Sequence, residues 1–272
     1  MAAGLLTERQ LRGSSWCRLL QGVYVHRDVP VTHALRAEAA TVLLPDAVVT
    51  GRSAAVLWGV DLAGPEDDVE VTLPPGSHMV RVLGLCSRRA ALPAGDVRRR
   101  RGLRVTSPAA TALRVAGVLG QDAAVAAVDQ LIASGVVDLD EVRRYVAGAR
   151  GPGSARGRRV AALADGLAES PPETRLRLLI GRSRLPDPVA QFRVLHAGRF
   201  VARVDFAWPE RRIALEYDGL WHAEKGQFAR DRRRLNALRE AGWSVVFVTA
   251  ADLRDPTALI ARIGRALDGI AH

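Results

Sequence analysis

The sequence predicts two folded regions in tandem, an α+β region followed by a compact α/β domain. Hydrophobic residues make up 48% of the 272 positions, which is enough to bury sizeable cores. The segment ARGPGSARGRR, at 149–159, is rich in Gly and Arg and separates two differently patterned stretches. We therefore expect an α+β region at 1–148, a linker at 149–168 and an α/β domain at 169–272.

The first region begins with short predicted helical turns at Thr7–Gly13 and Ser14–Gln21. A strand at Gly22–His26 follows them, and this order resembles a reduced winged helix with the strand as its wing. The elements predicted next are helices at Thr32–Leu44 and Arg52–Trp58, strands at Val69–Leu73, Val80–Cys86 and Leu103–Thr106, and helices at Pro108–Ala116, Asp122–Ala133 and Leu139–Ala147.

The second region follows the order helix, strand, strand, helix, strand, helix. Its predicted elements are a helix at Ser170–Ser183, a hairpin of Val204–Trp208 and Ile213–Tyr217, a strongly basic helix at Gln227–Ala241, a buried strand at Trp243–Thr249 and a helix at Pro256–Leu267.

The hairpin carries acidic residues between its apolar positions. Alternation predicts one apolar face formed by Val204, Phe206 and Trp208 on one strand and Ile213, Leu215 and Tyr217 on the other. If Trp208 pairs with Ile213, Asp205 lies directly opposite Glu216. Asp218 shares their face because side chains alternate along a strand.

Opposed carboxylates destabilise a hairpin unless something neutralises them. A divalent cation would do so, and carboxylate oxygens suit Mg²⁺ or Mn²⁺ better than zinc, so Asp205, Glu216 and Asp218 are candidate metal ligands. The alternative is a solvated hairpin in which Arg203 and Arg211 pair with the acids.

Glu173 and His222 are further candidates for this site. Glu173 shares the apolar stripe of its helix, which points it inward, and it also completes a capping box that starts at Ser170. His222 follows the hairpin and is a candidate general base, although a lone loop histidine is more often inert. Lys225 lies nearby and follows a loop.

The basic helix contains candidate phosphate contacts. Asp231 lies on its apolar stripe, where a pair with Arg234 would be structural. The predicted DNA-contacting side chains are Arg230, Arg232, Arg233, Arg234 and Lys225.

Composition supports a nucleic-acid partner. The formal net charge is +10, and Lys225 is the single lysine beside 38 arginines, whose planar guanidinium groups suit phosphates. The run Arg98–Arg101 would meet a DNA backbone or form a solvated edge.

No long apolar segment or secretion signal is evident, so we expect a cytoplasmic protein without a membrane span. Cys17 and Cys86 form no metal motif, and we expect buried thiols.

The pattern of residues 169–267 resembles the very-short-patch-repair-like endonuclease domains of the PD-(D/E)XK restriction-endonuclease-like superfamily. Its matching positions are Glu173, Gln191, Asp205-x10-Glu216-Tyr217-Asp218-Gly219, His222 and Asp231-x2-Arg234-x3-Leu238-x3-Gly242.

This resemblance implies a mixed four-stranded sheet flanked by helices. It also implies a metal held by Asp205 and Glu216, assistance from Glu173, and hydrolysis of phosphodiester bonds. Asp218 occupies the position of the usual superfamily lysine. An active site would therefore need His222, or a second metal held by Asp218, in its place.

The N-terminal region resembles AbiEi-like type IV antitoxin domains, which are thought to bind DNA as repressors. The resemblance lies in Leu19-Leu20-Gln21-Gly22-Val23-Tyr24, Arg52-Ser53-Ala54-Ala55-Val56-Leu57-Trp58-Gly59 and Val105-Thr106-Ser107-Pro108-Ala109-Ala110-Thr111.

Two functions follow from these patterns. The first is a Mg²⁺- or Mn²⁺-dependent DNA endonuclease or nickase. The alternative is a non-catalytic DNA-binding regulator, an antitoxin-like repressor that retains a nuclease scaffold. A third interpretation makes the N-terminal region a module for a partner protein or for homo-oligomer formation.

Overall fold

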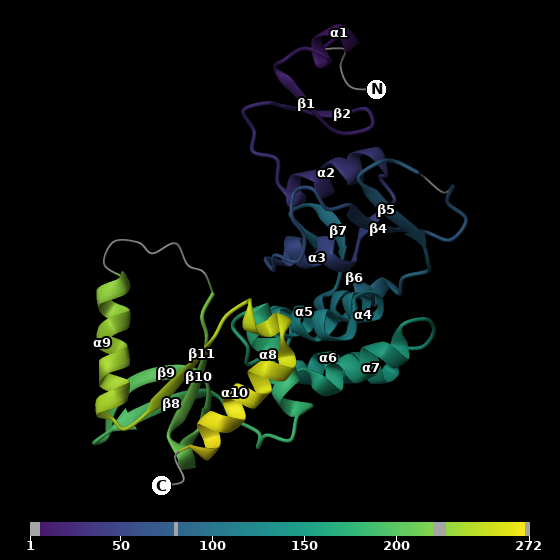
Figure 1. The fold of residues 1–272 in the computed structure, drawn as a ribbon. Helices are drawn as coiled ribbons and strands as arrows, with labels where there is room; N and C mark the ends of the chain where they lie inside the picture. Colours follow the sequence, from purple (N-terminus) through teal and green to yellow (C-terminus); the bar gives the residue numbers. More distant parts are fainter. Residues whose placement is uncertain (1–5, 79–80, 220–226, 270–272) are drawn as a thin grey trace. The chain divides into compact units, whose positions relative to one another are not determined.

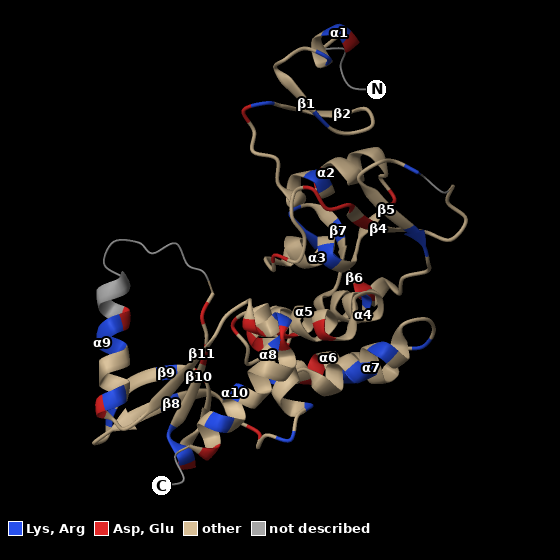
Figure 2. Ribbon diagram, viewed as in Figure 1, with Lys and Arg blue, Asp and Glu red and all other residues tan. Residues whose placement is uncertain are grey.

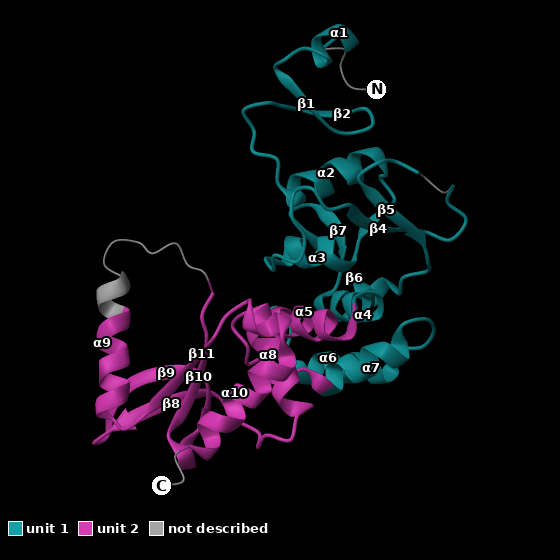
Figure 3. Ribbon diagram, in the orientation of Figure 1, with its two compact units in different colours: residues 1–119, 134–162 teal, residues 120–133, 163–272 magenta. Residues whose placement is uncertain are grey.

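The structure is a computed structural model that describes residues 6–78, 81–219 and 227–269. It contains two compact units, which are described separately below (Figure 3). Unit 1 comprises residues 1–119 and 134–162, and unit 2 comprises residues 120–133 and 163–272. The mixed α+β composition agrees with the prediction. Among the described residues, no helix is long and apolar enough to cross a membrane.

Unit 1 begins with helix α1 (Glu8–Leu11) and an antiparallel hairpin of β1 (Trp16–Leu20) and β2 (Val23–His26). The helical turn predicted at Ser14–Gln21 is therefore wrong. Gly22 has φ +77°, which lets the chain reverse between the two strands. The described start of the chain thus lacks the second helix that the winged-helix interpretation requires.

A five-stranded sheet forms the centre of unit 1, with the order β5-β4-β3-β7-β6. Its strands are β3 (Val48–Val49), β4 (Val69–Leu73), β5 (Leu85–Arg89), β6 (Val97–Arg100) and β7 (Leu103–Thr106). The strands predicted at β4 and β7 are confirmed, whereas β5 lies further along the chain than predicted. Three residues of the arginine run, Arg98 to Arg100, lie in β6, which is an edge of the sheet, and Arg101 follows in a turn. Cys17 and Cys86 are both exposed rather than buried.

The helices of unit 1 largely match the predicted positions. They are α2 (His33–Leu43), α3 (Gly51–Trp58), α4 (Pro108–Val118), α6 (Leu139–Gly148) and α7 (Ser154–Leu163), with a 3-10 turn, η1, at Ala94–Asp96. The segment that we expected to be a linker thus contains α7. That helix forms because Val160 and Ala161 are buried in the unit.

The motifs that resemble AbiEi-like domains hold unit 1 together. Ser53 Oγ accepts a hydrogen bond from the Glu70 amide at 2.8 Å and lies 2.7 Å from His33 Nε2. Trp58 Nε1 donates to the Thr106 carbonyl at 2.9 Å. Ser107 caps the start of α4. These residues join helices to the sheet, so their pattern reflects the fold.

Unit 2 contains the four-stranded mixed sheet that the resemblance to nuclease domains implies, with the order β11-β10-β9-β8. Only β10 and β11 are parallel. The elements are α5 (Gln121–Ala133), α8 (Pro171–Gly181), β8 (Val189–His196), β9 (Arg199–Trp208), η2 (Pro209–Arg211), β10 (Ile213–Tyr217), α9 (Gln227–Glu240), β11 (Ser244–Val248), η3 (Asp252–Arg254) and α10 (Pro256–Asp268).

Helices cover both faces of this sheet (Figure 1). Leu176 of α8 and Ile263 of α10 pack in one apolar cluster with Leu215 of the sheet. On the other face, Leu238 of α9 packs against Ala214. The alternation of the central strand β10 thus serves two cores, one on each side.

Asp129 joins α5 to the rest of unit 2. This fully buried carboxylate accepts hydrogen bonds from the amides of Asp165 and Gly166, both at 2.9 Å, and from the Thr174 hydroxyl at 2.8 Å. Arg177 of α8 lies 2.8 Å away and neutralises its charge. These contacts attach α5 to α8 within unit 2.

Candidate functional site

The β9–β10 hairpin has the predicted register. Trp208 pairs with Ile213, and Leu215 pairs with Phe206. Just beyond this last pair, Asp205 Oδ2 accepts a hydrogen bond of 2.8 Å from the Tyr217 amide. Asp205 and Glu216 therefore lie at the end of the backbone pairing between β9 and β10, where a side chain accepts the hydrogen bond from the Tyr217 amide.

The apolar face of β9 differs from the prediction at its first residue. Phe206 and Trp208 belong to the cluster of α8 and α10, but Val204 packs in the cluster that contains α9. The neighbouring strand is irregular at the same level, because Gln191 has φ +50°. A non-glycine residue in the left-handed region is uncommon and often marks a functional site.

Glu216 forms a bidentate ion pair with Arg234 of α9. Arg234 Nη1 donates to Oε1 at 2.5 Å, and Nη2 donates to Oε2 at 2.6 Å. Only 9% of the Glu216 side chain is exposed, so this pair lies largely away from water. The hydrogen bonds to Glu216 raise the pKa of Arg234. The predicted Asp231–Arg234 pair is thus replaced by Glu216–Arg234, and Asp231 adds a weaker attraction.

Asp205 has a perturbed carboxyl group. Burial raises its pKa to about 6, although the hydrogen bond from the Tyr217 amide opposes the shift. The negative charges of Glu173 and Glu216 raise it further. This carboxyl group can therefore exchange a proton near neutral pH.

Glu173 belongs to the same cluster and also anchors the start of α8. Its Oε1 accepts from the Ser170 hydroxyl at 2.7 Å, and its Oε2 accepts from the Glu169 amide at 2.9 Å. Gln191 Nε2 donates to the same Oε2 at 3.2 Å. The capping box differs from prediction, because Ser170 donates to Glu173 instead of accepting from the helix. The inward direction of Glu173 is as predicted.

The predicted metal does not suit this arrangement. A hard divalent cation needs several oxygens free to coordinate it. Both oxygens of Glu216 bind Arg234, and both oxygens of Glu173 accept local hydrogen bonds. Within the described ranges, no three His, Cys, Asp or Glu side chains are grouped to hold a metal ion. The Arg234 guanidinium occupies the neutralising role for Glu216.

The other predicted site residues are only partly placed. Asp218 is exposed, and its amide donates to the Val248 carbonyl at 2.7 Å. His222 and Lys225 lie outside the described residues, as does the side chain of Arg230.

The remaining arginines of this region have separate partners. Arg232 and Arg233 are exposed on α9, which Figure 2 shows as a helix with several basic positions. Arg203 pairs with Glu169, and Arg211 donates to the Leu267 carbonyl at 2.5 Å. The alternative interpretation, in which Arg203 and Arg211 pair with the hairpin acids, is therefore not what the described residues show.

Unit 1 has its own basic edge at β6 and the turn that follows it. Arg98, Arg99 and Arg101 are exposed there. Arg100 lies over the Trp58 ring, 5.6 Å from its centroid, which holds this side chain against the sheet. The edge thus presents several cations that a phosphate backbone could contact.

The sequence pattern did not predict the ion pair between Arg234 and Glu216. The apolar stripe of α9 does indicate the direction of the Arg234 side chain, because Leu238 is buried and lies four residues after Arg234. Residues four apart share a helix face, so Arg234 also points toward the sheet. Its partner could not be read from that spacing, because Glu216 lies on another element.

Comparison with known families links residues 47–165 to one of them. These residues match the family described as the AbiEi antitoxin C-terminal domain. The match begins just before β3 and ends after α7, so it covers the five-stranded sheet and most helices of unit 1.

Two mycobacterial relatives match nearly the whole chain. They are the uncharacterized proteins MT2308 and Rv2248 of Mycobacterium tuberculosis, from strains CDC 1551 and H37Rv respectively. Each is 34% identical over 263 residues, which is 95% of this chain and 95% of the relative. A solved structure, the crystal structure of RV2827C protein from Mycobacterium tuberculosis, aligns with a TM-score of 0.41 and 18% identity. That alignment covers 70% of this chain and 74% of the other.

Proposed function

We propose that this chain, which belongs to the same family as MT2308 and Rv2248 of Mycobacterium tuberculosis, is a DNA-binding, antitoxin-like regulator that does not cleave DNA. The observation that carries the proposal is the match of residues 47–165 to the AbiEi antitoxin C-terminal domain. An antitoxin acts with a toxin, so a toxin protein is its proposed partner. The cytoplasm, where both DNA and such a toxin would be met, is the proposed location.

The ion pair in unit 2 supports a non-catalytic role. Hydrolysis of a phosphodiester by a metal requires carboxylates that can bind the cation. To bind a cation, Glu216 would have to leave Arg234, and the guanidinium would then lose its bidentate partner. The scaffold is therefore better suited to holding α9 against the sheet than to binding a metal.

Charge supports DNA as the ligand. The net charge of +10 attracts a polyanion, and the β6 edge presents exposed arginines. Exposed cations neutralise phosphates and release counterions, which makes the affinity fall as salt rises.

Binding to the DNA upstream of the protein's own gene tests the proposal. We expect a complex whose affinity falls with salt and exceeds that for random DNA of equal length. Arg99→Gln with Arg101→Gln should lower the slope of log affinity against log salt by about 2, because each lost phosphate contact contributes about 0.9. Arg89→Gln with Arg144→Gln removes the same charge elsewhere in unit 1 and is the matched control. Equal slopes for the two double variants would refute contact through the β6 edge.

A second candidate function is the metal-dependent endonuclease or nickase. The raised pKa of Asp205 and the left-handed backbone of Gln191 favour it, because such perturbations gather at catalytic sites. Nicking of supercoiled plasmid with Mn²⁺ or Mg²⁺, abolished by Asp205→Ala, would support it. Plasmid that stays intact with either metal would exclude it.

A further inference from the structure

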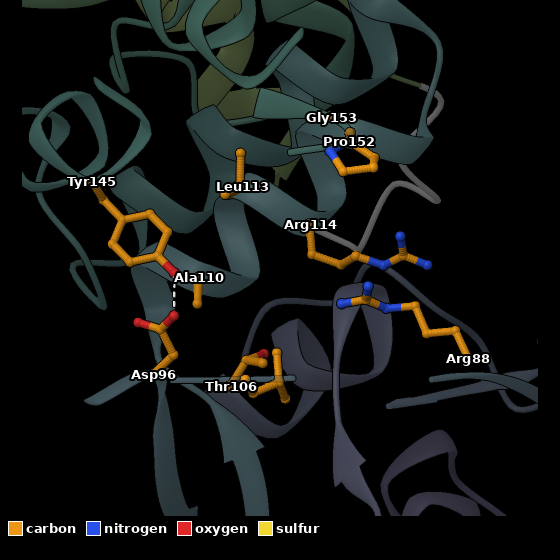
Figure 4. Close-up of a pocket in the computed structure, with 11 residues that line it drawn as sticks. Arg88, Asp96, Thr106, Ala110, Leu113, Arg114, Tyr145, Pro152 and Gly153 are labelled. Atoms are coloured by element: carbon orange, nitrogen blue, oxygen red, sulfur yellow. Dashed lines mark hydrogen bonds between the residues drawn. The ribbon is translucent and has the colours of Figure 1, made fainter. Parts of the chain in front are cut away.

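A cavity of about 200 Å³ lies within unit 1, among residues of β5, α4 and α6. Figure 4 shows the side chains that surround it. Arg88 and Arg114 lie toward one end of the cavity, and Asp96 and Tyr145 lie toward the other. Leu113 contributes to its apolar wall. All of these positions fall within residues 47–165, and none of them belongs to the acidic cluster of unit 2.

The two arginines converge on one end of the cavity from different elements. Arg88 projects from β5 and Arg114 projects from α4, and their guanidinium ends approach each other in Figure 4. The Nε atoms of both side chains are buried and have no hydrogen-bond partner among the described residues. One N–H donor of each guanidinium group is thus shielded from water and unpaired among the described residues.

No acidic side chain in the described part of the chain pairs with either arginine. Glu70 attracts Arg88, but its carboxylate accepts a hydrogen bond of 3.1 Å from Arg52 instead. Burial lowers the pKa of Arg88, and the positive charge of Arg114 lowers it further. The cavity therefore concentrates positive charge that the protein itself leaves unbalanced.

Unpaired buried donors and neighbouring like charges both destabilise a folded protein. An oxyanion between the guanidinium groups removes both penalties, because each group can present parallel N–H donors to it. We propose that this cavity binds a phosphate group between Arg88 and Arg114, supplied by a small phosphate ester or by a DNA backbone.

The end of the cavity opposite the arginines determines how a ligand would be oriented. Tyr145 donates its hydroxyl proton to Asp96 Oδ2 at 2.6 Å, and this bond is drawn in Figure 4. The Asp96 carboxylate repels an anion but accepts further hydrogen bonds. A small ester that occupies the whole cavity therefore places its phosphate at the arginines and a hydroxyl or amine at Asp96.

Thermal unfolding of the full chain with inorganic phosphate tests the site directly. Ionic strength is held constant with sodium chloride, so that general screening is the same in every sample. We expect a saturable rise in the unfolding temperature with phosphate, because a ligand that binds the folded state stabilises it. Arg88→Met and Arg114→Met should each weaken the apparent affinity about tenfold or more.

Arg89→Met is the matched control for Arg88→Met. Arg89 is the next residue of β5 and is exposed, so its side chain points to the other face of the strand. Its phosphate response should equal that of the unaltered chain. If a methionine variant fails to fold, Arg114→Lys serves instead, since it keeps the charge and removes the planar fork.

Binding of duplex DNA distinguishes the two sources of phosphate. If the ligand is a small ester, Arg88→Met leaves DNA affinity unchanged while the response to phosphate is lost. If it is the DNA backbone, Arg88→Met weakens DNA binding and lowers the salt slope by about 1, whereas Arg89→Met does not. A chain that shows no phosphate response, and DNA binding that is unaffected by Arg88→Met, would overturn the proposal.

Discussion

Replacement of Arg234 by methionine removes the cation that neutralises Glu216 and leaves most of the aliphatic packing in place. Loss of one partner from a buried ion pair costs about 3–5 kcal/mol, because the remaining charge is buried without compensation. Glu216 is 9% exposed, but Arg234 is 35% exposed, so water can reach part of the vacated space. We therefore expect the free energy of unfolding to fall by about 2–3 kcal/mol at pH 8.

The loss should depend on pH in one direction. Without Arg234, the buried Glu216 carboxylate has no cation beside it, so the loss arises from an uncompensated negative charge. We therefore expect the destabilisation to be larger at pH 8 than in acid, because acid removes negative charge from carboxylates. Urea unfolding at several pH values measures this difference.

Two control variants distinguish the stability lost with the ion pair from the effect of any substitution on α9. Arg239→Met removes an exposed arginine from the same helix and should change stability by less than about 1 kcal/mol. Glu216→Gln with Arg234→Met removes both charges and should recover part of the loss. If Arg234→Met is no less stable than Arg239→Met, Arg234 does not neutralise a buried carboxylate and the reasoning fails.

Two other substitutions test the buried carboxylates. Asp205 has a folded pKa of about 6 against an ordinary value of 3.8, so its ionisation destabilises the fold increasingly as pH rises between these values. In urea unfolding, Asp205→Asn should be more stable than the unaltered chain by about 1–3 kcal/mol above pH 6 and equal to it below about pH 4, and a gain only at low pH would contradict this sign. Asp129→Ala removes the acceptor for the Asp165 and Gly166 amides and the partner of Arg177, so we expect thermal unfolding to show a loss of at least about 3 kcal/mol. A loss below about 1 kcal/mol would show that the contacts between α5 and α8 do not depend on this carboxylate.

Local patterns predicted the hairpin of unit 2 well. The short connection and the alternation of apolar residues fixed the pairing of Trp208 with Ile213, because these constraints act over a few neighbouring residues. Alternation did not predict the face of Val204, which packs in the cluster of α9 and lies on the strand next to the irregular backbone of Gln191. Periodicity assumes regular backbone, so it cannot register such an irregularity.

Contacts between distant residues were beyond the reach of these patterns. Arg234 and Glu216 lie on different elements, and Asp129 meets Arg177 across 48 positions of sequence. Spacing along one helix indicates which way a side chain points, but it does not identify the partner that it meets. The acids of the candidate site were therefore identified from sequence, whereas the cation that neutralises one of them was not.

At the start of the chain the predicted secondary structure itself was wrong. Residues Ser14–Gln21 were interpreted as helix, but Gly22 closes a hairpin and makes β1 a strand. A short segment gains little from helix formation by itself, so pairing with a neighbouring strand decides its conformation.

Whether this chain binds DNA without cutting it can be measured by incubating the full chain with upstream DNA in the presence of Mn²⁺ or Mg²⁺. Binding and strand integrity are followed in the same samples. We expect a complex that weakens as salt rises, with the DNA intact at every protein concentration. Cleavage by the unaltered chain that disappears in Asp205→Ala would contradict the proposed non-catalytic function and establish the acidic cluster as a nuclease site.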